Sequence, residues 1–202
     1  MAALKHTYTD RKFLEAATFR IKFKDYFHLK LLYIMMHEWL VDEKYATRED
    51  SDFPENFYMH RETQRSGTEK WIWWRLTKVP TDNTYYRYVL DLDFHVILLK
   101  EAEVMHKGTK FKTNWGEVEI KVWANLEGDY EHKWRDHPIL KHFEELFRKR
   151  IFWADFQMHK NEFFREAYRF QEAIKTYLKL RTYLPEPELE EFYPPLGLGE
   201  PT

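Results

Sequence analysis

The stretch that decides the fold is residues 85–99, YYRYVLDLDFHVILL, which alternates between two kinds of side chain with a period of two. Such alternation is typical of a long β-strand with one buried face and one polar face. The apolar row consists of Tyr86, Tyr88, Leu90, Leu92, Phe94, Val96 and Leu98. The opposite row carries Arg87, Asp91, Asp93 and His95. We therefore predict a strand whose apolar row forms the floor of the core.

Further strands are predicted on both sides of this stretch. Alternating or β-prone segments occur at 18–24, 57–64, 70–78 and 117–124. Polar turns at 65–68, 80–84 and 107–108 lie between successive members of the series 57–64, 70–78, 85–99 and 117–124. Short connections of this kind join antiparallel neighbours. The pattern predicts an antiparallel sheet of about five strands.

Two segments have helical spacing. In residues 26–44, apolar side chains recur every three or four positions, and Asp25 precedes them as a candidate N-cap. A second helical pattern starts after Asp136 and continues almost to Tyr183, as one helix or as two helices joined near 153–157. An antiparallel sheet needs a cover for its apolar face. We expect these helices to provide it.

The predicted fold class is α+β: an antiparallel sheet covered by an early helix and a long C-terminal helix. Residues 1–184 form a single domain, and 185–202 form an extended C-terminal arm rich in Pro and Glu. The element order is similar to the helix-grip arrangement of lipid-transfer and polyketide-cyclase-like domains. This resemblance implies a binding cavity for an apolar or aromatic small molecule between the sheet and the long helix. Its lining would include Tyr86, Tyr88 and Phe94.

Composition limits the possible functions. The formal net charge is −2 with both signs interspersed, so we do not expect nucleic-acid binding. The absence of Cys excludes disulfides, thiolate metal sites and a cysteine nucleophile. No apolar run approaches the ~20 residues of a membrane helix, and MAALKHTYTDRK lacks the apolar core of a signal peptide. We expect a cytoplasmic protein without membrane contact, and no cofactor, because the 6 Gly form no phosphate-binding loop.

One polar constellation has two interpretations. Asp91, Asp93 and His95 share the polar face of the opening strand, and Glu117 and Glu119 lie beside them if the next hairpin is in register. Carboxylates with an imidazole can bind a divalent cation or transfer protons. The alternative is an ion-paired sheet face, in which these acids meet the bases Arg20, Lys22, Arg75 and Lys121. A metal site requires the side chains to converge.

Two other groups of residues bear on function. His159, Glu162 and Glu166 share one helical face and can contribute to a carboxylate site, although we interpret them as surface charge. Trp71, Trp73 and Arg75 share the outer face of a strand. They can stack on a flat ligand or on RNA bases, or they can be covered by protein, for which a subunit interface is the natural arrangement.

The C-terminal stretch PEPELEEFYPPLGLGEPT, residues 185–202, favours self-association. It carries five Glu and no Lys or Arg, with Phe192 and Tyr193 as aromatic anchors, and its acids can meet bases at 148–150. We therefore expect a homo-oligomeric, non-enzymatic structural or interaction protein that self-associates through aromatic surfaces and this arm. The alternatives are the small-molecule binder described above and, third, a metal-dependent enzyme centred on Asp91, Asp93 and His95.

Overall fold

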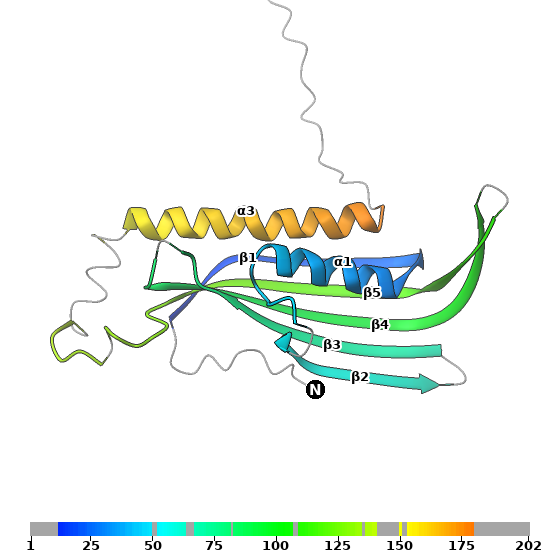
Figure 1. The fold of residues 1–202 in the computed structure, drawn as a ribbon, viewed down its shortest axis with the longest axis horizontal. Helices are drawn as coiled ribbons and strands as arrows, with labels where there is room; N and C mark the ends of the chain where they lie inside the picture. The colour runs from blue at the N-terminus through cyan, green and yellow to red at the C-terminus, as the bar shows by residue number, and fades with distance from the viewer. Residues whose placement is uncertain are drawn as a thin grey trace, which may run out of the picture.

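The predicted α+β architecture is confirmed. The computed structural model describes residues 12–49, 52–63, 67–81, 83–106, 109–134, 136–140, 150 and 153–179. A five-stranded antiparallel sheet forms one layer, and two helices lie together on one of its faces (Figure 1). The elements are β1 (Lys12–Phe27), α1 (Leu29–Asp42), β2 (Glu55–Thr63), β3 (Gly67–Lys78), β4 (Tyr86–His106), β5 (Thr109–Gly128) and α3 (Trp153–Tyr177).

The strand order across the sheet is β1-β5-β4-β3-β2. Strands β2 to β5 follow one another as a meander, and β1 returns to pair with the last of them, β5. Asp91 of β4 lies opposite Trp123 of β5 and Arg75 of β3. His95 lies opposite Glu119 and Trp71 in the same way. This register places the polar row of β4 at the centre of the face that the helices leave open.

The long hairpin of β4 and β5 contains an irregularity near its middle. The pairing register shifts between Ile97 and Lys100, and Leu98 has a φ of 59°. Leu99 therefore packs against the core, whereas the simple alternation predicts Leu98. Gly116 lies across from this bulge, where a Cβ atom would be 3.1 Å from the carbonyl oxygen of Ile97. Beyond the bulge the hairpin curves past the ends of the helices (Figure 1).

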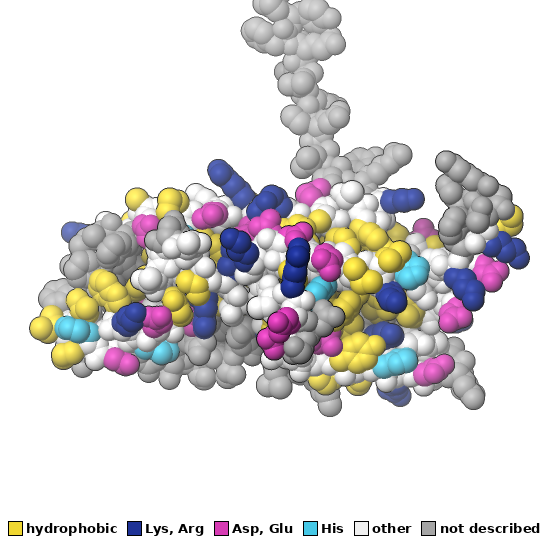
Figure 2. Space-filling view, in the orientation of Figure 1, with side chains coloured by type: hydrophobic (Ala, Val, Ile, Leu, Met, Phe, Trp, Pro, Cys, Tyr) yellow, Lys and Arg dark blue, Asp and Glu magenta, His cyan; other side chains and the backbone are white. Residues whose placement is uncertain are grey.

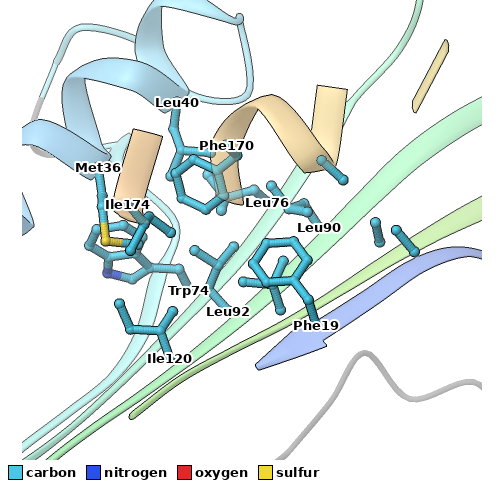
Figure 3. Packing of buried hydrophobic residues seen from close by; sticks show 14 of the residues in the cluster. Phe19, Met36, Leu40, Trp74, Leu76, Leu90, Leu92, Ile120, Phe170 and Ile174 are labelled. Atoms are coloured by element: carbon cyan, nitrogen blue, oxygen red, sulfur yellow. The ribbon is translucent and has the colours of Figure 1, made fainter. Parts of the chain in front are cut away.

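The core lies between the helices and the sheet. Side chains of α1 (Met36 and Leu40) and of α3 (Phe170 and Ile174) approach Trp74 of β3 in this layer (Figure 3). All five belong to one buried cluster, and Met36, Leu40 and Trp74 are fully buried. Complete burial of one such side chain contributes about 1.5–3 kcal/mol of transfer free energy. The contact between the helices and the sheet is therefore the main source of stability.

The first helix is capped by another residue than the predicted Asp25. The N-cap of α1 is His28, whose Nδ1 accepts from the backbone N–H of Leu31 at 3.3 Å, while the carboxylate of Asp25 accepts from Tyr26 N–H. Helix α3 begins at Trp153, where a junction between two helices is one of the predicted alternatives. The helix predicted to start near Asp136 falls largely on residues 141–149, which lie outside the described residues. None of the helices described is both long and apolar enough to cross a membrane.

Candidate functional site

The polar row of β4 is divided between two sets of partners. Arg75 places Nη2 2.7 Å from Asp93 Oδ1 and Nε 3.9 Å from Asp91 Oδ1. His95 instead places Nε2 2.9 Å from Oε1 of Glu69, and this hydrogen bond lowers the pKa of the Glu69 carboxyl. Among the described residues, no three His, Asp or Glu side chains are grouped so that they could hold a metal ion.

The two acids predicted to lie beside this row are present on β5, but they turn toward β1. Glu117 pairs with Lys22, with Nζ and Oε1 2.7 Å apart. Glu119 pairs with Arg20 and lies 3.3 Å from Lys121 Nζ. The cations of β1 therefore compete with any ligand for these carboxylates. The arrangement matches an ion-paired sheet face.

The aromatic side chains of β3 stack within the chain. The Trp71 ring lies 3.6 Å from that of His95, and the Trp73 ring lies 4.2 Å from that of Phe57. Trp73 and Arg75 are only 9% and 6% exposed. A flat ligand would have to displace these partners. Phe192 and Tyr193, the other predicted interface residues, lie outside the described residues.

Tyr86, Tyr88 and Phe94 lie on the core face of β4, where the resemblance to helix-grip domains places a cavity. Each of them is 1% exposed. The ring of Tyr88 stacks on Phe163 of α3, with centroids 4.5 Å apart and planes 10° apart. Packed rings therefore occupy this part of the interface. The open space near α3 lies instead along one flank of the helix.

Two polar residues occupy core positions of α3. Phe156, Phe163 and Phe170 recur every seven residues on the face toward the sheet, and His159 and Glu166 alternate with them at spacings of three and four. His159 is 1% exposed and Glu166 is 4% exposed. Burial of ionisable groups is unfavourable unless partners compensate it. The hydrogen-bond and ion-pair partners of His159 and Glu166 therefore determine the chemical role of these two residues.

His159 belongs to a directed hydrogen-bond chain. Asn83 Oδ1 accepts from the backbone N–H of Tyr85 and of Tyr86, which fixes the orientation of its amide. Asn83 Nδ2 is then the donor to His159 Nε2 at 3.0 Å. With Nε2 accepting, the neutral ring carries its hydrogen on Nδ1, 3.1 Å from Tyr88 Oη.

The chain ends at a carboxylate in contact with solvent. Tyr88 Oη donates to Glu162 Oε2 at 3.1 Å. The Glu162 side chain is 62% exposed. The series therefore leads from the half-buried amide of Asn83 through His159 and Tyr88 to the surface. The Asn83 amide also donates to Asp155 Oδ2 at 3.1 Å. The chain holds one oxygen of Glu162 and leaves the other available.

Glu166 belongs to a second network, which joins α3 to the end of β3 and to the residues that follow α1. Lys78 at the end of β3 forms an ion pair with Glu166 and lies 4.0 Å from Glu43 Oε2. Arg169 pairs with Glu43 at 3.0 Å. Lys78 Nζ also lies 5.0 Å above the ring of the buried Tyr45.

The network changes the acidity of two of its members. Burial raises the pKa of Glu166, Lys78 opposes this shift, and Glu43 adds to it. Burial also raises the pKa of Tyr45 well above its usual value, and the neighbouring Glu166 carboxylate adds to that shift. A buried, mutually coupled set of titratable groups next to open space is a feature of functional sites.

These two networks meet in an open groove of about 740 Å³ along α3. Its charged lining residues are Glu43, Lys78, Glu162, Arg165, Glu166 and Arg169. Four of the six pair with one another, as described above. Arg165 is exposed and forms no ion pair or hydrogen bond within the part of the chain described here. Arg165 and Glu162, three residues apart on α3, are therefore the two groups with capacity for a ligand.

The sequence contained a signal for this site. His159, Glu162 and Glu166 do share a helical face, but the interpretation as surface charge does not hold for His159 and Glu166, which are buried. The regular Phe156, Phe163 and Phe170 series shows that the positions between them face the core. Lys78 and Glu43 carried no comparable signal, because only the fold brings their distant segments together.

The groove can hold a small polar molecule by charge and hydrogen bonding. The guanidinium of Arg165 can bind a carboxylate or phosphate through two parallel N–H donors. The free oxygen of Glu162 can accept from a donor on the same molecule. No family model and no curated protein matches this chain in comparisons with known proteins.

Proposed function

We propose that this chain is a binding protein for a small polar molecule with an anionic group, which it holds in the charged groove along α3. The observation that carries the proposal is Arg165, an exposed guanidinium without a partner among the described residues, in a groove whose other cations are paired. A carboxylate or a phosphate is the group that matches its planar donor fork.

Glu162 sets a second requirement on the ligand. Its carboxylate is positioned by Tyr88, which is itself positioned by His159 and Asn83. A surface carboxylate normally has many orientations, and holding it in one lowers the entropy lost on binding. The preferred ligand therefore carries an N–H or O–H donor close to its anionic group, as an amino acid does.

The proposal keeps the small-molecule alternative from the sequence but changes its position and chemistry. The rings of Tyr86 and Tyr88 pack against α3, Phe94 packs against Trp74, and the groove is charged. Self-association through aromatic surfaces and the C-terminal arm stays a prediction, because Phe192 and Tyr193 lie outside the described residues.

A melting-temperature assay with three probes tests the proposal: inorganic phosphate, succinate and L-glutamate. A ligand at 100 times its Kd stabilises the folded state by about 2.7 kcal/mol. For a chain of this size, that corresponds to a rise of roughly 5–10 °C. We expect L-glutamate to give the largest rise, because it supplies both an anionic group and a donor.

Two variants identify the groove as the site of any such rise. In R165A the rise is lost, whereas in K160A it persists, because Lys160 carries the same charge on α3 but does not line the groove. The proposal is contradicted if none of the three probes raises the melting temperature. It is equally contradicted if R165A responds like the unmodified chain.

A further inference from the structure

Helix α1 carries apolar side chains both on the side that faces the core and on other sides. Ten of its 14 residues are aliphatic or aromatic, yet only Leu32, Met36 and Leu40 are buried. On the side away from these, Leu31 and Ile34 are 50% and 41% exposed. A helix with apolar residues all round is normally covered on more than one side. The described residues thus leave an apolar side of α1 partly exposed.

The exposed apolar surface extends beyond the helix. A groove of about 440 Å³ runs between Ile34 and Phe53, and His37 lies on its floor with its ring 4.4 Å from that of Phe53. Hydrophobic side chains also gather in the region of α1 on the face shown in Figure 2. Exposed apolar side chains gathered in this way mark an interaction site.

The described chain ends beside the start of this surface. The hydroxyl of Tyr177, at the end of α3, donates to the carbonyl oxygen of His28 at 3.0 Å. Leu178 is buried, and Lys179 is the last residue described. Residues 180–202 therefore continue from the N-terminal end of α1. At about 3.3 Å per extended residue, seven residues span the ~21 Å length of this helix.

The geometry points to α1 as the docking site of this chain's own residues 180–202, with Leu31 and Ile34 at its centre. The segment has enough length to follow the whole helix and reach the groove at Phe53. It also has the matching composition, because five apolar residues recur within it: Leu189, Phe192, Tyr193, Leu196 and Leu198. Its Pro residues suit an extended strap that needs no helical or sheet partner. This inference is independent of the α3 groove.

A nitroxide label on α1 tests the inference in the full chain. The natural sequence contains no Cys, so Glu38→Cys provides a single attachment point. The Glu38 side chain is 62% exposed and lies beside the apolar surface. We expect the label to broaden the amide NMR signals of residues 185–202 in the chain that carries it. Adding Ile34→Ser should abolish this broadening, whereas Met105→Ser, at another exposed apolar position, on β4, should not.

A mixed sample distinguishes docking within one chain from docking between chains. It contains ¹⁵N-labelled chain without the nitroxide and unlabelled chain that carries it. We expect no broadening of residues 185–202 in this mixture. The inference is overturned if the segment shows no broadening in the singly labelled chain, or if it broadens in the mixture, because the tail would then dock on a second copy. It is also overturned if Ile34→Ser leaves the broadening unchanged.

Discussion

Arg75 and Lys78 lie three residues apart on β3 and project from opposite faces of the sheet. The guanidinium of Arg75 is fully used, because it donates to the backbone carbonyls of Trp74 and Leu92 and pairs with Asp93. Lys78 pairs with Glu166 in a network that opens into the groove along α3. The first network closes on itself and holds the sheet together. The second leaves binding capacity next to it, which is why we assign function to that side.

The largest expected loss of stability comes from breaking the closed network around Arg75. R75L removes the cation between Asp93 and the fully buried Asp91. Breaking a buried ion-pair network by removing its cation costs about 3–5 kcal/mol. Chemical denaturation followed by circular dichroism should show this loss.

The matched control is R20A on the same face of the sheet. The Arg20 side chain is 58% exposed, and an exposed ion pair contributes at most about 1 kcal/mol. If R75L and R20A lose similar amounts of stability, the Arg75 network is not the closed structural unit described here.

An intermediate effect is expected in the hydrogen-bond chain behind the groove. Y88F keeps the ring that stacks on Phe163 and removes only the hydroxyl between His159 and Glu162. Loss of one buried hydroxyl with two partners costs about 1–2 kcal/mol. Y58F is the control, because the Tyr58 hydroxyl hydrogen-bonds only to the Lys70 amine among the described side chains. Equal unfolding midpoints for the two variants would show that the chain through Tyr88 adds no stability.

The smallest expected effect is a pH dependence at Glu166. Its pKa is raised by burial above the ordinary 4.5, so the folded state binds this proton more tightly than the unfolded chain does. The corresponding stability is fully present below pH 4.5 and is lost as the pH rises through the raised pKa. The difference in unfolding free energy between the unmodified chain and E166Q should therefore decrease as the pH rises above 4.5. A difference that increases with pH would instead mean that Lys78 outweighs burial.

The contrast between the sheet face around Arg75 and the groove along α3 also explains what could be predicted from the sequence. The alternation from Tyr86 to Phe94 identified the central strand, because a period of two records the burial of one sheet face directly. The positions of Asp91 and Asp93 on the polar face followed from it. Leu98 broke the pattern, since a bulge depends on pairing with β5 and leaves little trace in a single strand.

The groove was harder to predict, because its parts are distant in sequence. Glu43 follows α1, Lys78 ends β3, and Arg165 lies on α3. Only the buried positions of His159 and Glu166 could be read locally, from their alternation with the Phe series of α3. Charged residues in a helix are usually exposed, so this general tendency favours surface positions for both residues, against the local spacing.

The most direct test of the central claim is the melting temperature of E162Q/R165A, with and without the probe that stabilises the unmodified chain. Both side chains are exposed, so their replacement leaves stability within about 1 kcal/mol of the original. The probe should then no longer raise the melting temperature. A double variant that loses several kcal/mol, or that still responds to the probe, would contradict the claim.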